Sequence, residues 1–120
     1  MFEIKIDSGK KVFYAFAEGF FNMDEAKKFE QEFLAKAKSV NTSEYSLLIN
    51  TKDLKPSSPE VADNMSNIIK MYLETPFKKR IALKVEFVLA QMQIERIGKA
   101  IPNFNLIKFV KDEKEAYSLI

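Results

Sequence analysis

The spacing of apolar residues changes several times along the chain, and this feature constrains the fold more than any other. Short segments carry apolar residues at alternate positions or in continuous runs, and longer segments carry them every three or four positions. The first spacing is typical of β-strands and the second of amphipathic α-helices. The succession of these segments therefore predicts an α/β protein in which helices connect the strands.

The first two strands are expected to form an antiparallel hairpin. Apolar and charged side chains alternate over residues 2–7, and turn-forming residues follow up to residue 10. The segment 12–17 is apolar on both faces, which is typical of a more central strand. Three further strands are expected at residues 45–50, 80–87 and 104–110.

Four helices are expected between and after these strands. The first begins after Asn22, which is a suitable N-cap, and the last begins after Asp112. The second, third and fourth helices are expected at residues 59–74, 88–100 and 113–120. Each has an inner apolar stripe at helical spacing. In the first helix the stripe is Ala26, Phe29, Phe33 and Ala37, and in the third it is Ala90, Ile94, Ile97 and Ile101.

The resulting order, β-β-α-β-α-β-α-β-α, predicts one domain over residues 1–120. We expect a single mixed, mostly parallel five-stranded sheet with an N-terminal β-hairpin and about four helices. Parallel crossovers are right-handed almost without exception, so strands laid side by side in sequence order place their helices on one face. The other face is then expected to be open, with Ala15 and Leu48 making its middle less polar. Glu3, Lys5, Lys84 and Glu86 are expected near the margins of this face, and Arg80 is also expected to point outward from its strand.

The chain contains no histidine and no cysteine, and this restricts its chemistry. Ser-His-Asp and Cys-His catalysis, thiol nucleophiles and the usual zinc and iron ligand sets are excluded. We therefore expect no cofactor, no metal site and no enzymatic activity. The remaining catalytic alternative is carboxylate chemistry, for which Asp53, Glu60 and Asp63 are the candidates.

Charge and hydropathy predict the location of the protein and the classes of partner that it does not bind. The 19 basic and 17 acidic residues are mixed along the chain and give a net charge of +2, so nucleic-acid binding is not expected. The first residues alternate in polarity, unlike a signal peptide, and no stretch approaches the roughly 18 apolar residues of a membrane span. We expect a cytoplasmic protein with no integral membrane association.

Four segments carry a family resemblance: AEGFFNMDEAKKF, YSLLINTKDLKPSSPE, AQMQIERIGKAI and FVKDEKEAYSLI. Through them, and through the layout of nearly the whole chain, the sequence resembles the STAS fold of sulfate-transporter tails and anti-sigma-factor antagonists. Within that fold it is most similar to the small stand-alone proteins of the SpoIIAA-like group. A distant likeness extends to CRAL-TRIO lipid-binding domains, which use the same β-α succession around an apolar pocket.

The resemblance implies a regulatory serine at the start of the second helix. In the antagonist branch, phosphorylation of a serine after the third strand controls docking to a partner kinase. The candidates here are Ser57 and Ser58. Helix capping is the competing and preferred interpretation. Either Ser58 is the cap, with Pro59 at the first helical position, or Ser57 is the cap and pairs with Glu60 in a capping box.

The third helix is apolar outside its inner stripe as well, at Val88, Leu89 and Met92. These residues are either covered by the end of the chain or available to a partner protein or a second copy. The expected partner surface consists of Asp53, Leu54, Leu89, Met92 and Arg96.

Two functions follow as hypotheses. The first is a non-enzymatic cytoplasmic regulatory or protein-interaction module of STAS type, with a protein partner and a homodimer as an option. The alternative is a small carrier or sensor that holds an apolar, lipid-like ligand between sheet and helices. Its pocket is expected to be lined by Tyr14, Phe20, Tyr72 and Phe87. A solid core with an exposed patch around Leu89 and Met92 favours the module, whereas an enclosed apolar cavity of roughly 300 Å³ or more favours the carrier.

Overall fold

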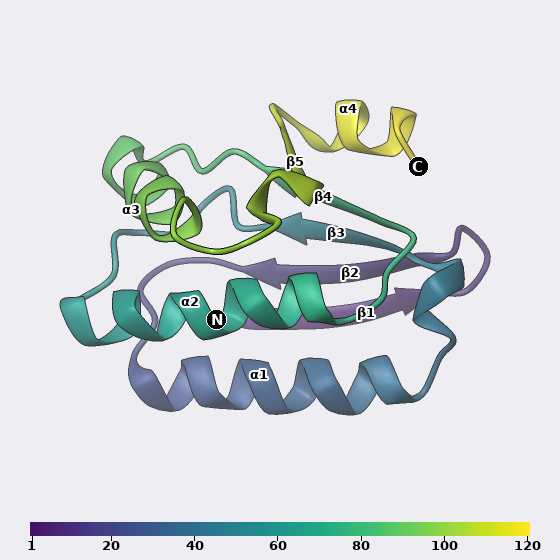
Figure 1. Ribbon diagram of the computed structural model, residues 1–120, viewed down its shortest axis with the longest axis horizontal. Helices are drawn as coiled ribbons and strands as arrows, with labels where there is room; N and C mark the ends of the chain where they lie inside the picture. Colours follow the sequence, from purple (N-terminus) through teal and green to yellow (C-terminus); the bar gives the residue numbers. More distant parts are fainter.

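A five-stranded sheet with helices against both of its faces makes up the computed structural model, which describes residues 1–120 (Figure 1). The strands are β1 (Phe2–Asp7), β2 (Val12–Ala17), β3 (Ser46–Asn50), β4 (Lys79–Leu83) and β5 (Ile107–Val110). The helices are α1 (Met23–Lys38), α2 (Pro59–Glu74), α3 (Val88–Gly98) and α4 (Glu113–Ser118). Two 3₁₀ turns complete the fold, η1 (Thr42–Glu44) and η2 (Phe104–Leu106).

The strands lie side by side in the order in which they occur along the chain. β1 runs antiparallel to β2, with Phe2 opposite Ala17 and Asp7 opposite Val12. The three following strand pairs are parallel. The predicted fold class, an α/β fold on one mixed and mostly parallel sheet with an N-terminal hairpin, is therefore confirmed.

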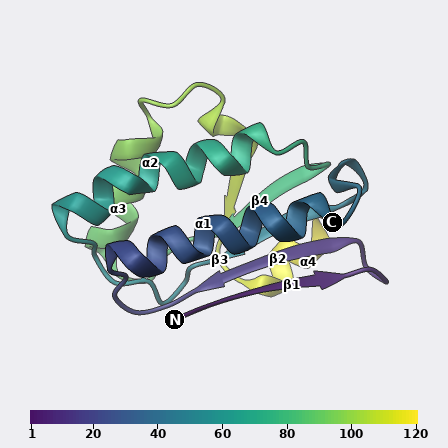
Figure 2. The same ribbon diagram turned by 90° about the horizontal axis from the view of Figure 1, so that it is seen from below.

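The main core lies on the face of the sheet that α1, α2 and α3 cover, with α1 and α2 side by side over the strands (Figure 2). Successive strand residues point to opposite faces, so Phe13 and Leu47 reach this core while their chain neighbours do not. The Phe13 ring lies 5.0 Å from the Phe33 ring of α1 and 5.2 Å from Phe77, between ring centroids. Burying each such ring contributes about 3 kcal/mol.

The opposite face of the sheet is partly covered by α4, so the expectation of an open face was wrong. Ala116 of α4 is completely buried against apolar side chains from four strands: Val12, Leu48, Ile81, Leu83 and Val110. The handedness rule fixes the face only for helices that connect two parallel strands. Because α4 follows the last strand, that rule did not apply to it.

Three helices begin at residues whose side chains accept a hydrogen bond from the first helical turn. Asn22, Ser58 and Asp112 each accept from the backbone N–H three residues further on, at 2.8, 3.4 and 2.8 Å. Such a cap satisfies an N–H group that has no partner within the helix. α3 differs from them, because its N-cap residue, Phe87, offers no side-chain cap.

Arg80 closes the other end of α2, although its charge was expected to face outward. Its guanidinium donates hydrogen bonds to the backbone carbonyls of Tyr72, Leu73 and Thr75, at 2.7, 3.1 and 2.7 Å. The last carbonyls of a helix have no partner within it, and a planar guanidinium is suited to bind several of them. Partial burial lowers the pKa of Arg80.

The later elements are shorter than the sequence indicated. The chain leaves the sheet after Leu83, although the Lys84 N–H still donates to the Val110 carbonyl at 2.9 Å. Residues 104–106 form η2 rather than the beginning of β5. α3 ends at Gly98 and α4 at Ser118, each two residues before the expected end.

Candidate functional site

The loops that follow β2, β3 and β4 meet at one edge of the sheet, because these parallel strands all end there. In Figure 1 this is the side on which α3 lies. Gly19 and Leu54 pair as an isolated bridge between the first two loops, and the Gly19 N–H donates to the Asp53 carbonyl at 3.0 Å. The Glu86 N–H donates to the Lys52 carbonyl at 2.9 Å and ties the third loop to the second. In open α/β sheets, such a carboxyl edge is the usual location of a functional site.

Two glutamines of α3 hold its start and the loop after β3 in place. The Gln91 side-chain carbonyl accepts from the Val85 N–H at 2.9 Å and ties the start of α3 to the loop that precedes it. The Gln93 amide accepts from the Ser57 N–H at 2.9 Å and donates to the Ser57 carbonyl at 3.1 Å. This paired contact resembles a step of a β-ladder and fixes α3 against residues 51–58. The orientation of the first turn of α3 is therefore well defined.

The first turns of α3 present an apolar surface to solvent. Phe87, Val88, Leu89 and Met92 are 43, 70, 66 and 57% exposed. We call these four residues the edge patch. Ala90, between them, is buried in the small core with Ala17, Leu54 and Val85. Single exposed apolar residues are common on protein surfaces, but four on adjacent positions at one helix start form a contiguous apolar patch.

The remaining residues of the expected partner surface divide into two groups. Asp53 and Arg96 are exposed. Leu54 is buried, so its placement on the partner surface was wrong. The pairing of Gly19 with Leu54 extends the β2–β3 contact beyond the strands and turns the Leu54 side chain inward.

The two serines before α2 have different positions. Ser58 is the N-cap of α2 and Pro59 follows at the first helical position, so capping by Ser57 with Glu60 was wrong. The Ser57 backbone is bound by Gln93, and its side chain lines a cavity. Phosphorylation of either serine remains a prediction.

That cavity lies between the sheet, α2 and α3 and has a volume of about 90 Å³. Sixteen of its 18 lining residues are hydrophobic, and the other two are Thr51 and Ser57. The volume is well below the roughly 300 Å³ at which ordinary ligand pockets begin. The cavity is therefore too small for a whole lipid chain.

Of the four aromatic residues expected to line a pocket, only Tyr72 does so. Burial raises the pKa of Tyr72, so it is un-ionised at neutral pH. Phe20 is 67% exposed and lies under the Lys55 ammonium, which is 4.9 Å from the ring centroid. Phe87 belongs to the edge patch. Tyr14 points to the opposite face of the sheet, because its neighbour Phe13 fills the main core.

The aromatic side chains that do line the cavity with Tyr72 were missed: Phe21, Phe29, Phe104 and Phe109. Phe29 is on the expected inner stripe of α1, which was a usable signal. Phe104 and Phe109 come from the end of the chain, and no spacing rule relates that end to α2. Their role depends on tertiary packing alone.

Tyr14 takes part in a hydrogen-bonded cluster that holds α4 to the sheet. Its hydroxyl donates to Glu113 Oε1 at 2.9 Å and accepts from Asn50 Nδ2 at 2.8 Å, and the same amide nitrogen lies 3.0 Å from Glu113 Oε1. Burial, opposed by the Asn50 bond and reinforced by the Glu113 carboxylate, raises the pKa of Tyr14 to about 12. At neutral pH Tyr14 is therefore a hydrogen-bond donor and not a base.

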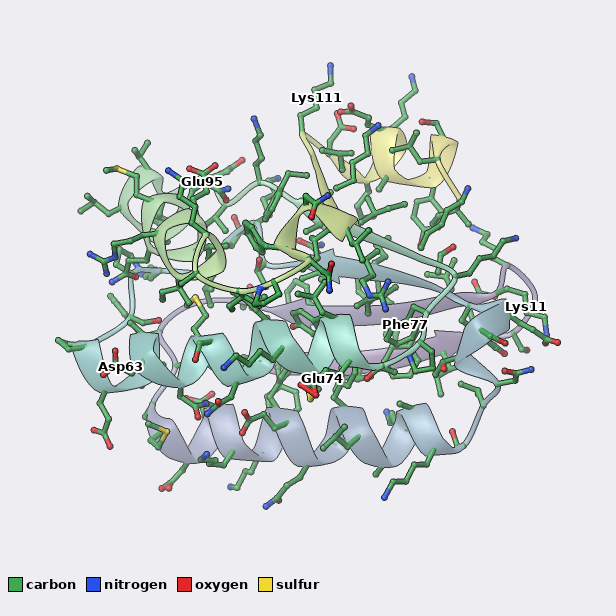
Figure 3. All side chains as sticks on the ribbon, in the orientation of Figure 1. Lys11, Asp63, Glu74, Phe77, Glu95 and Lys111 are labelled. Carbon is green, nitrogen blue, oxygen red and sulfur yellow. The ribbon has the colours of Figure 1, made fainter.

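The candidate carboxylates do not form a site. Asp53, Glu60 and Asp63 are all exposed, and Asp63 points outward from α2 in Figure 3. The fold brings together no group of three or more acidic side chains that could hold a metal ion. No helix has both the length and the apolar character that crossing a membrane requires.

The chain was compared with models of protein families and with curated protein sequences. It matches none of them.

Proposed function

We propose that this protein is a non-enzymatic, STAS-like protein-interaction module that works in the cytoplasm as a regulatory or scaffold protein. Its contact surface is the edge patch, supplemented by Phe20, Asp53 and Arg96 around it. The observation that carries the proposal is the exposure of four large apolar side chains on the rigidly held start of α3.

The edge patch is not needed to complete the core. Ala90, Ile94 and Ile97 supply the inner face of α3, and both glutamine contacts come from the flanks of the helix. Each methylene group of these side chains that is exposed to water would contribute roughly 0.8 kcal/mol if it were buried. A partner that covers the patch recovers this free energy. Met and aromatic residues of this kind are enriched at the centres of protein interfaces.

The charges around the edge patch favour a protein as the partner. Lys52 and Glu86 lie 3.6 Å apart as an ion pair beside the patch, and Glu95 and Arg96 follow it on α3. Figure 3 shows Glu95 pointing away from the body of the molecule. Nucleic acids and anionic membranes attract surfaces of a single, positive sign. A rim that carries both signs suits another protein, including a second copy of this chain.

Site-specific photocrosslinking tests this proposal. A benzophenone amino acid placed at Leu89 probes the edge patch, and the same group at Leu34, a half-exposed leucine on α1, is the matched control. We expect a crosslinked product in cells from position 89 and none from position 34, and we expect Val88→Glu to abolish it. The mass of the product distinguishes a second copy from a different protein. Absence of a product at position 89, or equal products at both positions, would contradict the proposal.

A further inference from the structure

We infer that the cavity between the sheet, α2 and α3 is a binding site for a small, uncharged aliphatic molecule with one hydroxyl or carbonyl head, about three to four carbons long. This site is separate from the edge patch and does not depend on it. The inference rests on the walls of the cavity, its size and the chemistry of its lining.

The cavity exists where short side chains leave space beneath α2 and α3. α3 packs on α2 at the side of the sheet (Figure 1) and contributes Ile94 to the wall of the cavity. The apolar side chains that would fill this space are short, because Ala17, Ala26 and Ala82 face it. Protein interiors seldom leave voids larger than a water molecule. A void walled by three alanines is therefore a feature of the sequence and not a packing accident at one residue.

Phe104 closes the far wall of the cavity. Its ring can lie there because residue 98 is a glycine and has no Cβ atom. A Cβ atom built on Gly98 would overlap the Phe104 ring, so no other residue at position 98 tolerates the ring where it lies. The ring also lies 5.9 Å from Phe109, between centroids. Phe104 is only half-buried and is carried by the short turn η2, outside the regular helices and strands. It is therefore the wall residue whose truncation would lengthen the cavity.

The size and lining of the cavity define the class of ligand. Its volume of about 90 Å³ is roughly three-fifths of that of an engineered cavity of about 150 Å³ that binds benzene, and it therefore suits a chain of about three to four carbons. No charged residue lines it, so a buried ionised group would have no partner. Cavities with a mainly apolar lining take up apolar molecules of matching size.

The two polar lining residues provide a place for the head of the ligand. Thr51 and Ser57 both lie in the loop after β3, at the carboxyl edge of the sheet. Neither side-chain hydroxyl makes a hydrogen bond within the chain, although the Ser57 backbone is fully engaged with Gln93. Each hydroxyl can donate to and accept from a ligand oxygen. A short alcohol would place its carbons among the alanines and its hydroxyl at this loop.

A titration with 1-alkanols from methanol to 1-hexanol, followed by amide chemical shifts, tests the inference. We expect shifts centred on the lining residues, and affinity that rises about fourfold per carbon because each buried methylene contributes similarly. The rise should stop at 1-propanol or 1-butanol, where the cavity is full. Affinity that rises with the same slope through 1-hexanol would indicate surface partitioning and overturn the inference.

Variants separate the cavity from the rest of the surface. Ala82→Val fills the cavity and should weaken 1-propanol binding about tenfold or more, whereas Ala37→Val, the same change outside the cavity, should leave it unchanged. If Ala82→Val does not fold, Ile68→Phe fills the same space from α2. Phe104→Ala should move the length limit to longer alcohols. Thr51→Val should weaken binding about two- to tenfold without moving that limit, as expected for one lost hydrogen bond. Equal affinities in the filling variants and the control would refute the site.

Discussion

Tyr14 shows how one hydroxyl connects distant parts of this chain. Through Glu113 and Asn50 it joins β2 and β3 to α4, which is the last element of the fold. Tyr14→Phe keeps the ring and removes both hydrogen bonds. We expect it to lower the free energy of unfolding by about 1 kcal/mol, measured by urea denaturation at pH 7. Tyr117→Phe, in which an exposed tyrosine of α4 loses a hydroxyl without a hydrogen-bond partner, is the control and should change little.

The raised pKa of Tyr14 has a consequence at alkaline pH. The ordinary pKa of tyrosine is about 10 in the unfolded chain, and in the folded protein that of Tyr14 is about 12. A raised pKa means that the folded state holds its proton more tightly, so the stabilisation is complete below pH 10. It is lost as the pH rises from 10 through 12. The free energy of unfolding, measured by urea denaturation at several pH values between 10 and 12, should fall less steeply with pH for Tyr14→Phe than for the wild type. An unchanged slope would contradict the assigned cluster.

Arg80 is the residue at which side-chain geometry matters most. Three carbonyls at the end of α2 depend on its planar guanidinium, and a lysine cannot reach all of them from one position. We expect Arg80→Lys to destabilise the protein by about 1–3 kcal/mol in urea denaturation. Arg96→Lys, on the exposed face of α3, should stay within about 0.5 kcal/mol of the wild type. Similar values for the two variants would show that the Arg80 contacts do not contribute.

At the scale of elements, the two adjacent serines at the start of α2 have different roles. Ser58→Ala removes the cap and should cost about 0.5–1 kcal/mol, at the lower end because the capping bond is long at 3.4 Å. Ser57→Ala should be nearly neutral, because only the backbone of Ser57 is bound inside the protein. Thermal denaturation of the two variants measures the difference. A larger loss for Ser57→Ala would contradict the assigned cap.

The docking of α4 depends on one small buried side chain. Ala116→Asp places a carboxylate among the apolar residues under α4, and an unpaired buried charge is strongly unfavourable. We expect hydrogen exchange in α4 and β5 to accelerate while the core of β2 and β3 stays protected. Ser118→Asp adds the same group at an exposed position of α4 and should leave exchange nearly unchanged. Global loss of protection in Ala116→Asp would mean that α4 is not a separate unit.

The elements could be predicted from the sequence where their periodicity was distinct. The stripes of α1 and α2 and the alternation in β1 each identify their element, and right-handed crossovers then place three helices on one face. The ends of the elements were harder to predict from the sequence. Val85 continues the alternation of β4 although the chain has left the sheet, because it is buried against Leu54 instead. The turn of the hairpin was expected to end at residue 10, yet Lys11 adopts the left-handed conformation with φ 57°.

At the scale of the whole molecule, helical geometry gave part of the candidate site and tertiary packing gave the rest. Leu89 and Met92 lie off the inner stripe of α3, which left open whether the end of the chain covers them, and the structure leaves both exposed. The cavity depends on how α3 packs against the loop after β3, through Gln93 and Ser57, and against the Phe104 ring, through Gly98. Neither contact has a spacing signal, because each joins segments that are distant or irregular.

The most direct test of the central claim, contact with a partner protein through the edge patch, is native mass spectrometry of the protein isolated under mild conditions. The wild type should carry a second chain, either another copy or a different protein. Leu89→Glu should appear alone at 13.9 kDa, and Leu34→Glu should keep the partner of the wild type. A wild-type protein found only at the mass of a single chain, or a Leu89→Glu variant that keeps its partner, would contradict the account.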